Sequence, residues 1–154
     1  MCDVDGEGAI GLVLNRPSRS PVHDYLPQWS PGEPSVVFVG GPVQPEIAVG
    51  LAEHSGQSPI GFTEISGDIG LFDLATPVEL VSGALSQLRV FSGYCGWARG
   101  QLEDELAAGD WIVVASEPDD PFTADAERLW TAVLRRQGGE LATLADIPVD
   151  PRLN

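Results

Sequence analysis

Short apolar runs separated by glycine, proline and polar turns dominate the first two thirds of the chain, which predicts strands. Residues 9–14 (AIGLVL) are continuously apolar, as in a strand buried on both faces. In residues 46–53 apolar residues alternate with small ones, which predicts a strand, with a helix beginning at Pro45 as the alternative. Further strands are expected at 35–39, 61–65, 69–74, 87–91 and 110–115, with a hairpin turn at Gly67-Asp68.

Residues 17–34 hold five prolines and predict a long, stiffened connection. Its larger apolar side chains are spaced to bury one side of a short helical turn, with Ser20 as its cap and Pro21 at its first position. These side chains are Val22, Tyr25, Leu26 and Trp29.

Helical patterns appear mainly in the last third of the chain. Thr76-Pro77-Val78-Glu79 matches a capping box and predicts a helix over 77–84. A second helix is expected over 100–108, ended by Gly109, and the longest over 124–137, capped by Thr123. A last short helix near 140–145 follows. Because strands and helices mix without a βαβ repeat, we expect residues 1–154 to form one α+β domain with parallel and antiparallel strand pairs.

The charge excludes several classes of function. The 154 residues carry a formal net charge of -15, and all eight basic residues are arginine. A lysine Schiff base and a Walker-type lysine are therefore excluded. Direct binding to DNA or to an anionic membrane is not expected, because both need a basic surface. The adjacent pair Arg135-Arg136 is interpreted as complementing the dipole at a helix C-terminus.

Metal and covalent chemistry have little support in the sequence. His23 and His54 are far apart and neither cysteine has a C-x-x-C partner, so we expect no metal and no cofactor. Cys95 is better interpreted as a small buried thiol than as a nucleophile. The acidic runs at 103–105 and 119–120 are interpreted as solvated faces. Two cysteines in a chain of this size favour a cytoplasmic setting.

The candidate ligand site is a glycine-rich stretch, residues 92–100, between a predicted strand and a predicted helix. Such a loop can hold an anion with its backbone N–H groups. Alternatively, its glycines only let the chain turn while Tyr94 and Trp97 pack. The candidate binding residues are Asn15, Arg16, Gly93, Tyr94, Gly96, Trp97, Arg99 and Gln101. We expect Arg16 to be partly buried and hydrogen-bonded, either at the ligand site or to hold the proline-rich connection in place.

Several ordered motifs together resemble one family over nearly the whole chain. They are residues 8–17 (GAIGLVLNRP), 40–43 (GGPV) and 93–103 (GYCGWARGQLE), followed by Asp110-Trp111 and Leu129-Trp130. These motifs resemble the AlgH/YqgE family of bacterial proteins. The resemblance implies a single domain whose strands form a pseudo-barrel-like double sheet flanked by helices. It implies no agreed activity, although the family's founding name suggests a role in regulating alginate synthesis.

The sequence therefore favours a non-enzymatic cytoplasmic protein that binds or regulates a protein or small-molecule partner. The alternative is an enzyme of unknown class that binds an anionic small molecule at 92–100. The family resemblance also implies an additional strand segment upstream of Met1. We therefore expect either that these residues are part of a longer chain or that self-association covers the strand at 9–14. The family usually has Ala at the position of Cys95, which argues further against a catalytic thiol.

Overall fold

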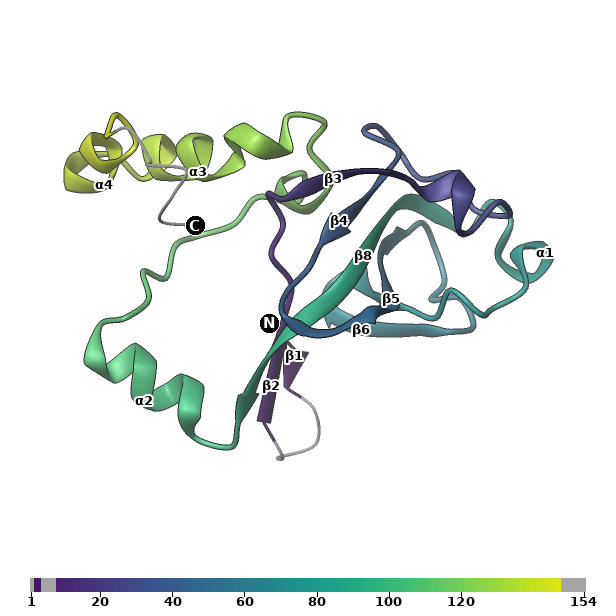
Figure 1. Ribbon diagram of the computed structural model, residues 1–154, viewed down its shortest axis with the longest axis horizontal. Coiled ribbons are helices and arrows are strands. Elements are labelled where there is room, and N and C mark those ends of the chain that lie inside the picture. Colours follow the sequence, from purple (N-terminus) through teal and green to yellow (C-terminus); the bar gives the residue numbers. More distant parts are fainter. Residues whose placement is uncertain (1, 4–7, 148–154) are drawn as a thin grey trace.

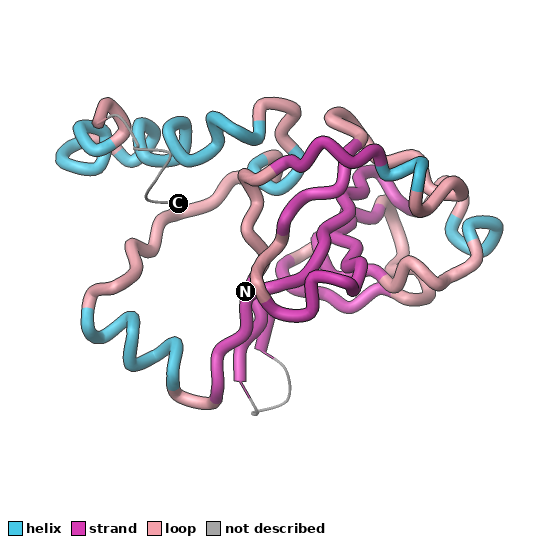
Figure 2. The backbone as a smooth tube through the Cα atoms, viewed as in Figure 1, coloured by secondary structure: helices cyan, strands magenta, loops and turns pink. Residues whose placement is uncertain are grey.

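The computed structural model describes residues 2–3 and 8–147, which form one mixed α+β domain (Figures 1 and 2). The strands are β1 (Cys2–Asp3), β2 (Gly8–Gly11), β3 (Pro17–Pro21), β4 (Val36–Val39), β5 (Val43–His54), β6 (Phe62–Ser66), β7 (Ile69–Phe72) and β8 (Leu85–Ala98). The α-helices are α1 (Val78–Val81), α2 (Gln101–Ala108), α3 (Leu129–Gln137) and α4 (Gly139–Leu144). Short 3₁₀-helices are η1 (Val22–Asp24), η2 (Asp120–Phe122) and η3 (Ala126–Arg128).

Strand β8 is the centre of the sheet. The hydrogen-bonded order is β1-β2-β8-β5-β7-β6, and β4 also pairs with β8 and with β3. The first half of β8 is antiparallel to β5, its end is antiparallel to β2, and its middle is parallel to β4 at Phe38 and Phe91. The prediction of parallel and antiparallel pairs in an α+β domain is confirmed. Among the described residues the path from β1 to β6 stays open.

Glycines allow the turn after β4 to press directly against β8. A Cβ atom on Gly41 would lie 2.2 Å from the carbonyl carbon of Tyr94. Gly93 has a φ of +68°, and a Cβ there would lie 2.6 Å from the carbonyl oxygen of Gly41. Side chains at these positions would therefore push the two backbones apart. The glycines serve close backbone packing at this point.

Strand alternation divides the core into two clusters on opposite faces of the sheet. On the first, the closed face, the chain from Val22 to Trp29 packs over the strands. The Trp29 indole donates a hydrogen bond to the Leu74 carbonyl at 3.1 Å and meets the Phe72 ring edge-on at 5.4 Å. The buried residues of this face are Val22, Trp29, Ala52, Phe72, Leu74, Val81, Leu88 and Val90.

The second face, the open face, has a smaller buried cluster. It consists of Phe38, Leu51, Phe91 and Ala126. Arg89 fixes the chain after η2 over this face. Arg89 is only 3% exposed, and its guanidinium donates to the carbonyls of Pro121 at 3.0 Å and Thr123 at 2.8 Å and lies 4.3 Å from the centre of the Phe38 ring. Burial lowers the pKa of Arg89.

Several predicted elements are confirmed. The strands expected at 35–39 and 46–53 appear as β4 and β5, and those expected at 61–65 and 69–74 appear as the hairpin of β6 and β7. The helix expected at 100–108 is α2, and Gly109 ends it in the left-handed conformation. The short helices near 22 and 140 are η1 and α4.

Other boundaries were predicted wrongly. The strand expected at 9–14 ends at Gly11 and is only half-buried. Residues 92–98 are not a loop, because β8 continues to Ala98. The helix expected at 77–84 spans only Val78–Val81, and Pro77 stands at its N-cap without a side-chain cap. Likewise Pro21, not Ser20, is the N-cap of η1, and Tyr25 is exposed.

The remaining errors in the predicted elements lie in the last third of the chain. Residues 110–115 form no strand, although their composition is that of one. The helix expected from 124 begins as the 3₁₀-helix η3 and becomes α-helical only at Leu129. Thr123 has extended dihedrals after η2 and makes no cap. Of the predicted apolar stripe, Trp130 is exposed and Val133 half-buried, whereas Ala126, Leu129 and Leu134 are buried.

Candidate functional site

The predicted glycine-rich site does not form a loop. Gly93, Tyr94, Gly96 and Trp97 belong to β8, and Gln101 is the first residue of α2. The Tyr94 hydroxyl donates to the Gln44 side-chain oxygen at 3.1 Å. The first turn of α2 carries Glu103 and Asp104, whose charges oppose an anion there.

Two of the candidate residues instead belong to a polar cluster around Glu105. Its carboxylate accepts hydrogen bonds from the indole N–H of Trp97 at 3.0 Å and of Trp111 at 2.8 Å. Gln101 donates to the same carboxylate at 3.2 Å and accepts from the Ala98 N–H at 3.0 Å. The two indoles meet edge to face at 5.7 Å. We call Trp97, Gln101, Glu105 and Trp111 the indole clasp.

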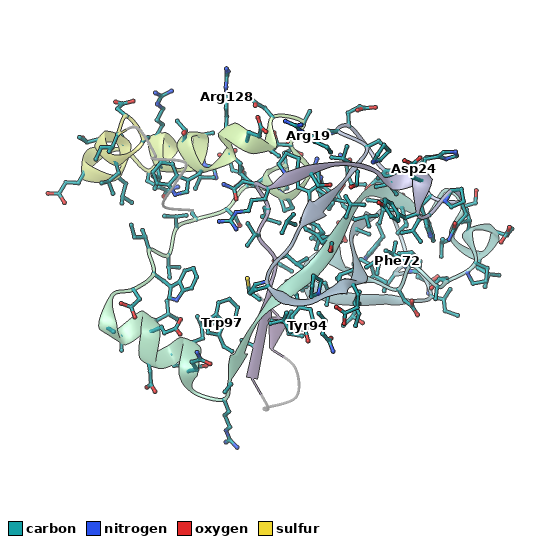
Figure 3. The ribbon with its side chains drawn as sticks, in the orientation of Figure 1. Arg19, Asp24, Phe72, Tyr94, Trp97 and Arg128 are labelled. Carbon is teal, nitrogen blue, oxygen red and sulfur yellow. The ribbon has the colours of Figure 1, made fainter. Side chains whose placement is uncertain are left out.

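The indole clasp joins three parts of the chain: the end of β8, α2, and the segment after α2. Figure 3 shows Trp97 extending from the end of β8 toward α2. The hydrogen bonds from Trp111, Trp97 and, least strongly, Gln101 lower the pKa of Glu105, and burial opposes them. Sequence reasoning missed Glu105 and Trp111. The i, i+4 spacing of Gln101 and Glu105 was the available signal.

The remaining polar candidates, Asn15, Arg16 and Arg99, do not come together in one binding site. Arg16 and Arg99 are exposed, so the expected partial burial of Arg16 is wrong. Among the described residues neither guanidinium makes a hydrogen bond or ion pair, whereas the Arg16 carbonyl accepts a hydrogen bond from the Val39 N–H at 2.8 Å. Asn15 is half-buried at the turn that follows β2. The backbone of Arg16 therefore holds β4, while its side chain is free of such contacts in this part of the structure.

Cys95 lacks the surroundings of an activated nucleophile. Burial raises the pKa of its thiol, and the Arg16 guanidinium opposes this only in part. His54 is opposite Leu85, ten positions along β8 from Cys95, which is roughly 30 Å along a strand. The His54 ring is buried, and its Nε2 is 3.8 Å from the Asp68 carboxylate. Cys95 and His54 therefore cannot act as a nucleophile and its base.

The adjacent arginines of α3 are occupied by carboxylates. Arg136 contacts Asp120 at 2.6 Å and Glu117 at 3.2 Å, and Arg135 contacts Asp146 at 2.7 Å. The hydrogen bond from Arg136 lowers the pKa of Asp120. Both arginines lie in the last turn of the helix, as predicted. They present no free basic pair to a phosphate backbone.

The structure places a cavity on the open face, where no candidate residue was predicted. Its volume is about 570 Å³. Most of its walls are apolar, and its polar side chains include three carboxylates but no arginine. The main apolar walls are Ile10, Leu12, Leu14, Leu51, Ile65, Ile69 and Leu71, the carboxylates are Glu53, Asp68 and Glu117, and Ser116, Pro118 and Pro121 close one side.

The segment leading to this cavity, residues 111–116, is extended and largely exposed. Trp111 is 48%, Ile112 58% and Val113 79% exposed. Within the described part of the chain its backbone N–H groups donate no hydrogen bond, and of its carbonyls only that of Ala115 accepts hydrogen bonds, from the side chains of Arg136 and Gln137. We call residues 111–116 the unpaired segment. In Figure 1 the chain leaves the end of α2 and returns to the sheet near β3.

Two features are absent from the described residues. No group of three or more histidine, cysteine or acidic side chains is placed to hold a metal ion within residues 2–3 and 8–147. In the same residues, no helix has the length and apolar character that crossing a membrane requires.

Comparisons with known proteins agree with the resemblance in the sequence. The model of a protein family described as "AlgH-like" matches residues 1–142 of the chain. A Streptomyces coelicolor protein named only as a UPF0301 protein is 50% identical over 161 residues, covering 100% of this chain and 83% of that protein. A Thermobifida fusca relative is 44% identical, covering 99% of this chain and 82% of its own length.

Two solved structures share the fold. A crystal structure of a Corynebacterium diphtheriae protein matches with a TM-score of 0.84 and 26% identity, covering 94% of this chain and 79% of that one. The solution structure of the AlgH protein from Pseudomonas aeruginosa matches with a TM-score of 0.67 and 26% identity, covering 96% of this chain and 82% of that one.

Proposed function

Because the chain belongs to the AlgH-like family, we propose that it is a non-enzymatic binding protein of the bacterial cytoplasm, whose ligand site is the open-face cavity. The observation that carries this proposal is the cavity itself. Its volume of about 570 Å³ lies within the range of roughly 300–1,000 Å³ that ligand sites occupy. Leu12, Leu51 and Ile69 are the kind of apolar wall that such sites use.

The described side chains support binding rather than covalent chemistry. The Cys95 thiol has a raised pKa and is far from the buried His54. The indole clasp holds Glu105 by three donors, which stabilises its charged form and makes it a poor proton donor near neutral pH. These groups contribute to packing and do not converge on one reacting centre.

The charge supports a protein or small-molecule partner over DNA. With a net charge of -15 and with Arg135 and Arg136 in ion pairs, the surface repels a phosphate backbone. A regulatory role would therefore act through a bound partner. Tight retention of a duplex DNA fragment at physiological salt would contradict this part of the proposal.

The cavity can be tested with the uncharged apolar dye Nile red. We expect its fluorescence to rise in the presence of the native protein and to fall back in Ile65→Trp, because the larger ring fills a wall of the cavity. Ile60→Trp is the matched control, since Ile60 is exposed and outside the cavity. Thermal unfolding of both variants checks that they fold.

Two results would contradict the proposed site. One is the absence of dye binding to the native protein. The other is equal dye binding by folded Ile65→Trp and Ile60→Trp, which would place the dye elsewhere.

A further inference from the structure

The unpaired segment and the cavity are continuous. Ser116, the last residue of the unpaired segment, also lines the cavity, as do Glu117 and Pro118 directly after it. The far walls of the cavity come from β2, β5, β6 and β7. A ligand lying along residues 111–116 therefore has the cavity at the end of the segment.

The backbone of the unpaired segment suggests the form of that ligand. Its sequence, WIVVAS, is rich in β-branched and aromatic residues, which are typical of strands. A strand without a ladder partner presents N–H and C=O groups at regular spacing. In the described residues these groups are almost all unpaired, and the indole clasp holds Trp111 at the beginning of the segment. An added extended chain would satisfy them.

The acidic side chains around this surface indicate which charge the two ends of the ligand should carry. Asp110 precedes the unpaired segment, and Glu53 and Asp68 line the cavity, where no arginine is present. A basic flank would complement these carboxylates. A second copy of the chain is a poor match, because each copy carries a net charge of -15 and long-range repulsion opposes their association.

We propose that the unpaired segment and the cavity bind an extended apolar peptide of a partner protein, flanked by lysine or arginine, which adds as a strand along residues 111–116. Backbone hydrogen bonds to the unpaired segment supply part of the affinity. Alternate side chains of the peptide enter the apolar cavity. This inference rests on the proposed function, since it names the occupant of the same cavity.

The test uses three synthetic peptides of alternating valine and threonine, each about ten residues long and so about 33 Å when extended. The first has two lysines at each end, the second is the same peptide with alternate backbone nitrogens methylated, and the third has glutamates in place of the lysines. We expect the first to bind in calorimetry. The methylated peptide should bind about tenfold or more weakly, because it lacks strand hydrogen bonds. The glutamate peptide should also bind more weakly, with a difference that shrinks as salt is added.

Hydrogen exchange locates the binding. Amides of residues 112–115 should become protected when the lysine peptide is added. The variant Val113→Pro removes one N–H donor and should weaken binding about tenfold, whereas Val113→Thr keeps the N–H and the β-branched shape and should bind nearly as the native chain does. Val113 is mostly exposed, so neither change disturbs the core.

Several outcomes would overturn the inference. One outcome is that Nile red occupies the cavity but the lysine peptide does not bind, or binds equally well when its backbone is methylated. The proposal of a partner that adds as a strand is then wrong, while the proposed function stands. If dye binding fails as well, the proposed function fails too. Self-association that Val113→Pro abolishes would identify a second copy as the occupant. Loss of peptide binding in a chain extended upstream, as the greater length of the relatives permits, would identify that extension as the occupant.

Discussion

The two faces of the sheet differ in how completely they are covered. On the closed face, Trp29 packs against Phe72 and donates to the Leu74 carbonyl, so that a ring and a hydrogen bond hold the covering chain in place. On the open face, the cover is the chain around η2, fixed mainly by the hydrogen bonds of Arg89 to backbone carbonyls. Beyond that cover lies the cavity.

This difference indicates a division of roles within one small domain. A fully buried cluster supplies stability, because close packing adds dispersion and removes apolar area from water. A partly covered cluster contributes less to stability, but it leaves apolar surface that a partner can bury. We therefore expect substitutions on the closed face to affect unfolding, and substitutions on the open face to affect binding.

The largest effect is expected for Phe72→Ala on the closed face. Phe72 is buried and in contact with Trp29, so the truncation should lower the free energy of unfolding by about 3–5 kcal/mol. Leu71→Ala, one residue earlier, changes a half-buried wall of the cavity and should cost only about 1 kcal/mol. Urea unfolding measures both values. Equal costs would show that the two faces do not differ as described.

Arg89→Met should have the next largest effect on the free energy of unfolding, because it removes the hydrogen bonds that hold the chain around η2 over the open face. The carbonyls of Glu33, Pro121 and Thr123 would lose their donors, and we expect a loss of about 3 kcal/mol in the free energy of unfolding. Arg89→Lys should recover part of this loss. Hydrogen exchange of residues 120–126 would show whether the cover has loosened, and unchanged exchange there would contradict the role given to Arg89.

Acid should release the indole clasp and leave the closed face intact. The pKa of Glu105 is lowered, so its stabilising contribution is complete above the ordinary glutamate pKa of about 4.3 and is lost as the pH falls through the lowered value. We expect a change in tryptophan fluorescence over that range without loss of secondary structure. Glu105→Gln should abolish the transition, and a transition that persists in this variant would assign it to another group.

The smallest effects are expected for Arg16→Ala and Arg99→Ala. Both side chains are exposed, so the free energy of unfolding should change by no more than about 0.5 kcal/mol in either variant. Nile red binding should also be unchanged, because neither residue lines the cavity. Loss of dye binding in either variant would bring the predicted glycine-rich site back into consideration.

The sequence predicted best the elements whose partners are close along the chain. The β6–β7 hairpin and helix α2 follow from local periodicity, the Gly67-Asp68 turn and Gly109. The prediction of a loop at residues 92–98 was wrong. The glycine at position 93 serves close contact with Gly41, which is distant in sequence, and not a turn between a strand and a helix. The prediction of a strand at residues 110–115 was wrong as well, because strand-like composition carries no information about a ladder partner.

The candidate site was predicted less well than the fold. The motif residues Trp97 and Gln101 were singled out, but the structure uses them in the indole clasp. The cavity could not be foreseen, because its walls come from β2, β5, the β6–β7 hairpin and the chain from Ser116 to Pro121. Residues so far apart are brought together only by the pairing of β2 and β5 with β8.

The central position of β8 has a consequence for the synthesis of the protein. Strands β2, β4 and β5 all pair with β8, yet all three precede it in the chain. At a translation rate of about 5–20 residues per second, β2 leaves the ribosome several seconds before β8 does. During that interval β2 can pair only with the short strand β1, so the edge of β2 that later joins β8 is open to chaperones or to neighbouring nascent chains. The sheet therefore assembles late, when the strand that joins its parts finally emerges.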